Sequence, residues 1–177
     1  IVALAEIGDK TQLLTLVLAA RYKKPWPIVA GIFVATLVNH AIAGAAGAWL
    51  TKAIGPDAMR WILGISFIAM AAWILVPDKL DDDASASRKV GGAFLTTTVL
   101  FFLVEIGDKT QIATVALAAR FDSLAAVVIG TTIGMIVANA PVAFFGEALA
   151  KRLPVRAVHL VAAIVFAALG IGVLAIG

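Results

Sequence analysis

The chain contains one heptapeptide twice, Glu-Ile-Gly-Asp-Lys-Thr-Gln, at residues 6–12 and again at residues 105–111. The similarity extends beyond the heptapeptide, since residues 6–21 and 105–120 are identical at 12 of 16 aligned positions. Two apolar helices would not share so many positions through composition alone. The repeat therefore predicts a chain built from two related halves.

Hydrophobic residues make up 62% of the 177 residues, and charged residues only 14%. Water-soluble domains carry about 25% charged residues, and a chain of this length cannot bury so large an apolar fraction in its own core. A membrane-spanning helix needs about 20 apolar residues. Six apolar runs of suitable length cover residues 1–20, 27–51, 60–76, 91–119, 124–150 and 154–176. We therefore expect an all-α integral membrane protein with six transmembrane helices in a lipid bilayer.

Each copy of the motif begins a group of three predicted spans. Because three is an odd number, the second group enters the membrane from the opposite side, and the halves form two inverted three-helix repeats. We predict repeat 1 at residues 1–76, a polar cytoplasmic loop at residues 77–90 and repeat 2 at residues 91–177. Transporters of this architecture bind their substrate near the membrane midplane, where the repeats meet.

Lysines and arginines are divided unevenly between the predicted loops. The loops after spans one, three and five hold nine of them, and the loops after spans two and four hold three. The nine are Arg21, Lys23, Lys24, Lys79, Arg88, Lys89, Lys151, Arg152 and Arg156, and the three are Lys52, Arg60 and Arg120. By the positive-inside rule the larger set is cytoplasmic, so both termini face outward. The same distribution gives no basic patch for nucleic acid.

The apolar stretches that precede the two motifs differ in length. Thirteen apolar residues, Gly92 to Val104, precede the second motif, whereas five precede the first. For equal depth in the membrane the first helix needs more residues, so we expect a short native segment before Ile1.

The chain has no cysteine, which excludes disulfides, thiolate metal sites and cysteine nucleophiles.

Histidine apart, the six ionisable side chains that lie well inside the predicted spans, away from their ends, all belong to the motifs: Glu6, Asp9, Lys10, Glu105, Asp108 and Lys109. Each costs about 2.5–3.5 kcal/mol at the centre of a membrane helix, so we expect them to face one another, water or an ion. On a continuous helix, at about 100° per residue, the acids and the lysine of each motif share one narrow face. Gln12 flanks that face, and Thr11 points away unless the helix unwinds beside Gly8; Gln111 and Thr110 repeat this pattern. Inverted repeats bring the two faces together, which predicts that four carboxylates converge.

The formal charges indicate a ligand for this site. Four acids and two lysines leave a charge of −2, which one divalent cation neutralises. Carboxylate and amide oxygens suit Mg²⁺, Ca²⁺ and Mn²⁺ rather than Cu(I) or Zn²⁺. When the ion leaves, crowded carboxylates are expected to take up protons. The predicted metal ligands are Glu6, Asp9, Glu105 and Asp108, with supporting polar side chains at Lys10, Thr11, Gln12, Lys109, Thr110, Gln111, Asn39 and Asn139.

Simpler interpretations exist for some of these residues. A salt bridge between Glu6 and Lys10, four residues apart, and its equivalent in the second motif would only help helices to pack. Asn39 and Asn139 lie in the middle of predicted spans. Two roles suit these side chains equally well. They either bind or gate the ion, or they form hydrogen bonds between helices.

At the two motifs the chain resembles the GDT-type cation/proton antiporter family. The hallmark of that family is two copies of Glu-hydrophobic-Gly-Asp-Lys/Arg-Ser/Thr, one in each three-helix half. Residues 6–11 and 105–110 match it at every position, and the resemblance covers essentially the whole chain. It implies that the four motif acids bind the cation and that Mn²⁺ or Ca²⁺ moves against H⁺. The short form is similar to bacterial members, which implies Mn²⁺ export across the bacterial inner membrane.

We therefore predict a secondary transporter, not an enzyme, that needs no cofactor and exports a divalent cation, with Mn²⁺ as the first choice, in exchange for protons. One alternative is a Ca²⁺/H⁺ antiporter, and a more remote one is an exporter of a basic amino acid whose ammonium sits among the carboxylates. An intramembrane hydrolase with paired acids finds no nucleophile beside a base in this sequence. A purely structural membrane protein would tolerate amide substitutions at the motif acids.

Overall fold

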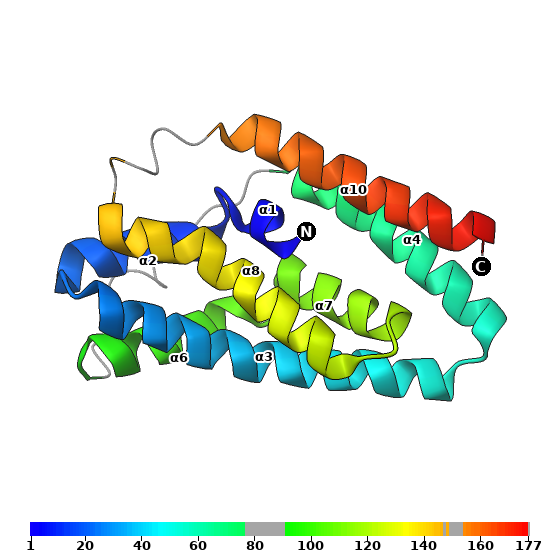
Figure 1. Cartoon of the computed structure of the whole chain (residues 1–177), viewed down its shortest axis with the longest axis horizontal. Coiled ribbons are helices and arrows are strands. Elements are labelled where there is room, and N and C mark those ends of the chain that lie inside the picture. The colour runs from blue at the N-terminus through cyan, green and yellow to red at the C-terminus, as the bar shows by residue number, and fades with distance from the viewer. Residues whose placement is uncertain (77–90, 147, 149–153, 177) are drawn as a thin grey trace.

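The computed structural model describes residues 1–76, 91–146, 148 and 154–176, and the regular elements among them are all helices (Figure 1). The predicted central loop, residues 77–90, lies outside the described residues. The helices are α1 (Val2–Glu6), α2 (Lys10–Tyr22), α3 (Pro25–Ala53), α4 (Pro56–Ile74), α6 (Ala93–Glu105), α7 (Lys109–Arg120), α8 (Leu124–Phe145) and α10 (Val155–Ile176). The all-α prediction is confirmed.

Among the described residues, four helices are long and apolar enough to cross a membrane by themselves: α3, α4, α8 and α10. Helix α6 is apolar but shorter. Proline stands at the beginning of α3 and of α4, where its missing N–H would have no partner in the helix.

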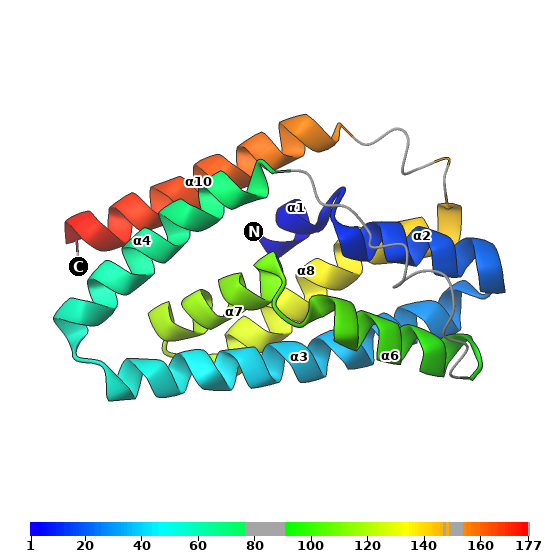
Figure 2. The ribbon, with the colours of Figure 1, turned by 180° about the vertical axis from the view of Figure 1, so that it is seen from behind.

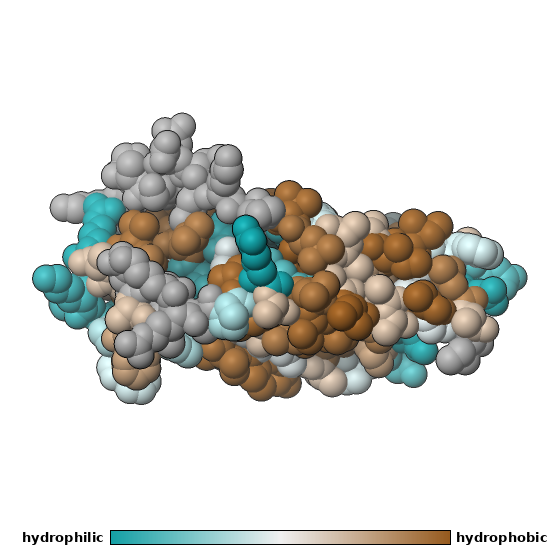
Figure 3. All heavy atoms as spheres, turned by 90° about the horizontal axis from the view of Figure 1, so that it is seen from above, coloured by the Kyte–Doolittle hydropathy of each residue, from teal (hydrophilic) through white to brown (hydrophobic). Residues whose placement is uncertain are grey.

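Large hydrophobic side chains cover the outside of these helices, as expected of a surface that faces lipid. Examples on α3, α4, α8 and α10 that are each at least 47% exposed are Phe33, Ile65, Ile129, Ile133, Val137, Ile164 and Ile171. On the part of the face in Figure 3 that is not grey, hydrophobic side chains cover much of the surface, and hydrophilic ones lie toward both ends of the long axis and near its middle. A water-soluble protein rarely exposes an apolar surface of this extent.

The helices pack as two groups that meet at the motifs. Helices α4 and α10 lie side by side (Figures 1 and 2) and contact α7 and α1. Phe67 of α4 and Phe166 of α10 meet in their shared core, with ring centroids 6.2 Å apart. Helix α3 packs against α6, α7 and α8, while α8 also packs against α1 and α2. Helix α3 thus contacts α6 and α7, which flank the second motif, and α8 contacts α1 and α2, which flank the first.

Each motif interrupts a helix, so the continuous helices predicted over residues 1–20 and 91–119 are wrong at these points. Helix α1 ends at Glu6 and α2 begins at Lys10, while α6 ends at Glu105 and α7 begins at Lys109. The residues between them leave the helical conformation because the chain turns at a glycine with positive φ, Gly8 or Gly107. A helical wheel therefore cannot place the motif side chains.

Candidate functional site

The Glu-Ile-Gly-Asp segment of each motif forms the same tight turn. The carbonyl of Glu6 accepts a hydrogen bond from the N–H of Asp9 at 3.0 Å, and Glu105 and Asp108 repeat this bond at 3.0 Å. The isoleucine has φ −66° and ψ 115° in the first motif, and φ −62° and ψ 118° in the second. The glycine that follows has φ +84° or +77°. These are the dihedral angles of a type II turn, which requires glycine at its third residue.

The aspartate and the glutamine of each motif close the turn onto the next helix. Asp9 is the N-cap residue of α2, and Asp108 is the N-cap residue of α7. Gln12 Oε1 accepts a hydrogen bond from the N–H of Gly8 at 2.8 Å, and Gln111 does the same for Gly107 at 2.7 Å. The arrangement is close to a capping box. It satisfies a backbone N–H that a broken membrane helix would otherwise leave unpaired.

As a result, the turn presents a glutamate from the end of one helix and an aspartate from the start of the next. One carboxylate oxygen from each of Glu6, Asp9 and Asp108 lies within 4.8 Å of the other two. All three residues are at most 2% exposed. Oxygens that share one ion at about 2.3–2.6 Å are at most about 5 Å apart. The spacing and the oxygen chemistry of this three-carboxylate group therefore fit a divalent cation.

Two oxygens of the three-carboxylate group have spare acceptor capacity. Within the described part of the chain, Glu6 Oε1 and Asp108 Oδ2 are buried without a hydrogen-bond partner. A buried polar atom normally finds a partner in the protein, water or an ion. The other oxygen of Glu6, Oε2, accepts a hydrogen bond from Thr11 Oγ1. Because the helix unwinds beside Gly8, Thr11 faces the acids, as the sequence predicted for that case.

Glu105, the fourth predicted ligand, lies outside the three-carboxylate group. Its side chain is fully buried and accepts two hydrogen bonds from α3, one from Thr36 Oγ1 and one from Asn39 Nδ2, both at 2.9 Å. Thr36 was not among the predicted residues, although it lies three positions before Asn39 on the same helix face. The two repeats thus hold their glutamates differently.

Asn139, the counterpart of Asn39 in the second half, makes no such contact. Its Oδ1 accepts a hydrogen bond from Thr15 at 2.8 Å, and its Nδ2 donates to the carbonyl of Met135 at 3.2 Å. Of the two asparagines, one supports a motif acid and the other joins α8 to α2. Thr110 is buried at 1% exposure, in the position that corresponds to Thr11.

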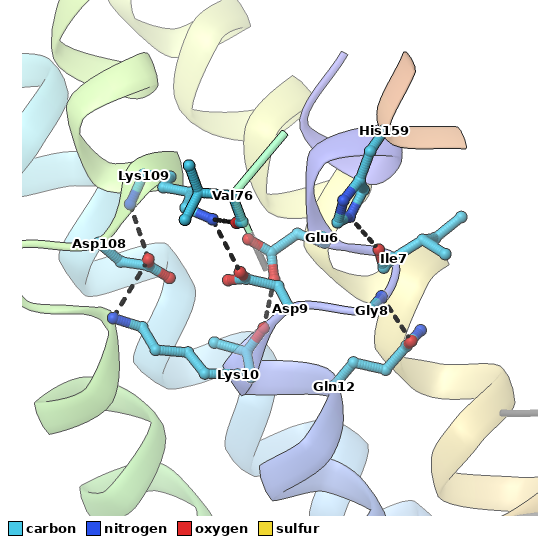
Figure 4. A network of polar contacts seen from close by, with 11 residues as sticks. Glu6, Ile7, Gly8, Asp9, Lys10, Gln12, Val76, Asp108, Lys109 and His159 are labelled. Atoms are coloured by element: carbon cyan, nitrogen blue, oxygen red, sulfur yellow. Dashed lines mark hydrogen bonds and ion pairs between the residues drawn. The ribbon is translucent and has the colours of Figure 1, made fainter. Parts of the chain in front are cut away.

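The motif lysines pair across the two halves (Figure 4). Lys10 Nζ lies 3.2 Å from Asp108 Oδ1, and Lys109 Nζ lies 3.8 Å from Asp9 Oδ1. Lys109 also donates to the carbonyl of Val76 at 2.9 Å, just beyond the end of α4. The alternative of a salt bridge inside each motif is therefore wrong, because the turn removes the i,i+4 helical spacing on which it depends.

Helix α10 contacts the first turn directly. His159 Nε2 donates a hydrogen bond to the carbonyl of Ile7 at 2.6 Å, and Val155 lies against Gly8. Helix α10 therefore touches the turn of the first motif, and the chain just beyond α4 touches Lys109 of the second. His159 stands apart from the motifs in the sequence, so no pattern around it indicated this contact.

Comparison with known proteins gives a consistent set of relatives. A sequence model described as "Divalent cation/proton antiporter GDT1" matches residues 1–82 and 93–177. A Vibrio cholerae protein named "Putative manganese exporter" is 51% identical over 93% of this chain and 82% of its own length. A Synechocystis protein, "GDT1-like protein sll0615", is 27% identical over 94% of this chain and 89% of its own length. No solved structure matches the chain.

Proposed function

The chain belongs to the GDT1 family of divalent cation/proton antiporters, and on that premise we propose that it exports Mn²⁺ from the cytoplasm in exchange for protons. The observation that carries the proposal is the meeting of Glu6, Asp9 and Asp108 within 4.8 Å, since these acids come from both copies of the motif. Their oxygens suit Mn²⁺, and the Vibrio relative is named for manganese export.

The proposed architecture is two inverted repeats of three transmembrane spans, residues 1–76 and 91–177, joined by a cytoplasmic loop at residues 77–90. In it, α1 with α2 and α6 with α7 each form one span that is broken at the motif, and α3, α4, α8 and α10 are the continuous spans. Broken helices at the midplane are a recurrent way to build an ion site in such transporters. Both termini face outward, and the membrane is a bacterial inner membrane.

Transport follows from the charge of the site. Glu6, Asp9, Glu105 and Asp108 carry four negative charges when ionised, and Lys10 and Lys109 carry two positive ones, so Mn²⁺ brings the sum to zero. Once the ion has left, two uncompensated charges remain in a buried site, and proton uptake removes that cost. A site that is neutral with the metal bound and also with protons bound can open to either face of the membrane in both states. Because it opens to one face at a time, export of the metal is coupled to entry of protons.

Ca²⁺/H⁺ exchange is the second candidate, because carboxylate oxygens also suit Ca²⁺. The export of a basic amino acid is a third candidate. The Lys10 ammonium lies beside Asp108, so the ammonium of such a substrate would also fit beside this acid. The three readings differ in the transported species, which competition between substrates separates.

The test is Mn²⁺-driven proton movement in proteoliposomes that contain a lumenal pH dye. Mn²⁺ should drive proton flux, and Asp9→Asn or Asp108→Asn should abolish it. Asp122→Asn is the matched control, because Asp122 is exposed in the connection between α7 and α8. Ca²⁺, Mg²⁺ and arginine serve as competitors. Metal entry without a change in the dye would contradict proton coupling, and full activity of Asp108→Asn would contradict the site.

A further inference from the structure

Lys10 and Lys109 occupy equivalent positions in the two motifs, but their surroundings differ. The Lys109 side chain is 3% exposed, and its ammonium contacts both Asp9 and the carbonyl of Val76. The Lys10 side chain is 26% exposed, and its ammonium lies beside Asp108 (Figure 4). One lysine is therefore enclosed and tied to the end of α4, while the other is partly exposed.

The partner of Lys10 belongs to the three-carboxylate group. Asp108 Oδ1 faces the Lys10 ammonium at 3.2 Å and also accepts the backbone N–H of Lys109 at 2.7 Å. An ammonium at this distance neutralises the carboxylate in the way that a bound cation would. A divalent cation that binds Asp108 therefore competes with Lys10 for the same negative charge.

From this asymmetry we infer that Lys10 is a displaceable counter-charge of the cation site. Its ammonium neutralises Asp108 before the cation arrives and moves off that carboxylate when the cation binds, whereas Lys109 stays in place. Lys10 thereby sets the affinity for the cation, because every binding event must first break its ion pair. The inference rests on the proposed function, since it assumes that a divalent cation binds among these acids.

The experiment measures binding of Mn²⁺ to the purified full chain in detergent, by the loss of the free Mn²⁺ signal in electron paramagnetic resonance. Lys10→Met removes the competing charge and should lower the Kd for Mn²⁺ by about tenfold or more. Lys10→Arg should raise the Kd, because a guanidinium holds a carboxylate through two hydrogen bonds and is harder to displace. If Lys10 has a purely structural role, Mn²⁺ should bind more weakly to both variants.

Lys109→Met is the matched control, since it also removes one positive charge beside the acids. Equal tightening in Lys10→Met and Lys109→Met would overturn the special role of Lys10, as would an unchanged or weaker affinity in Lys10→Met. If Lys10→Met does not elute as one monodisperse species, the competition measurement on Lys10→Ala below decides, because weaker binding in Lys10→Arg is also what a purely structural lysine predicts.

A second measurement tests the displacement directly. In Lys10→Ala, added ethylammonium should occupy the vacated position and raise the apparent Kd for Mn²⁺, with no such effect on the unsubstituted protein. Absence of that competition in Lys10→Ala would overturn the inference while leaving the proposed function intact. If the unsubstituted protein binds neither Mn²⁺ nor Ca²⁺, the proposed function itself fails, and the inference fails with it.

Discussion

Lys10 of the first motif and Asp108 of the second form an ion pair, with Nζ and Oδ1 3.2 Å apart. The two lie 98 positions apart in the chain, and Lys109 pairs with Asp9 in the reciprocal way. The motifs are thus complementary to each other, and each half supplies the counter-charge that the other half needs.

The ion pair between Lys10 and Asp108 should contribute to stability before any metal binds. Lys10→Met leaves Asp108 buried with its charge uncompensated, and we expect a loss of about 1–3 kcal/mol, less than for a fully enclosed pair because Lys10 is partly exposed. The double variant Lys10→Met/Asp108→Asn should recover part of that loss. The free energy of unfolding in mixed micelles measures both effects, and strictly additive losses would contradict the pairing.

The two motif glycines should respond differently to alanine. Both have positive φ, which costs an alanine about 1 kcal/mol or more. A Cβ at Gly107 meets nothing within 4 Å, whereas a Cβ at Gly8 would lie 3.1 Å from Cγ2 and 3.3 Å from Cβ of Val155. Gly8→Ala should therefore destabilise the protein more than Gly107→Ala.

Melting temperatures of the two variants provide the comparison. Adding Val155→Ala should rescue part of the loss in Gly8→Ala and none in Gly107→Ala. Equal losses in the two single variants would show that the contact between α10 and the first turn does not matter for stability.

The motif glutamines should stabilise the helix breaks. Gln111→Ala leaves the N–H of Gly107 without its acceptor and should cost about 1 kcal/mol. Gln12→Ala loses the equivalent bond to Gly8 and also the bond from Nε2 to the carbonyl of Ala138 at 3.0 Å, so its cost should be larger. Denaturation of both variants under the same conditions checks the order, and a larger cost for Gln111→Ala would contradict it.

Asn39 should matter for transport more than Asn139 does. Asn39→Leu removes one of the two described donors to the buried carboxylate of Glu105, and we expect Mn²⁺-dependent proton flux to fall by about tenfold or more. Asn139→Leu changes contacts with Thr15 and Met135 among the described residues and is the matched control. Similar flux in both variants would argue against a role for the position of Glu105 in transport.

Parts of the fold and of the candidate site have sequence signals that are local or repeated. The apolar runs predict the helices, since lipid demands about 20 apolar residues in each span. The motif marks the acids by the cost of burying them alone. The helix break also has a local sequence signal, which an argument from a continuous helix does not use. Gly8, Asp9 and Gln12 have the spacing of a turn followed by a capping box.

By itself, then, the sequence determined that this chain is helical, that its two halves are related and that its acids must find partners. Only the tertiary structure decided which partners they find. Lys10 faces Asp108 rather than Glu6, and Glu105 lies with Thr36 and Asn39 rather than with the other acids. The reason is physical: identical motifs make identical turns, but the helices packed around each turn differ, and those neighbours decide which charge is enclosed and which remains free to move.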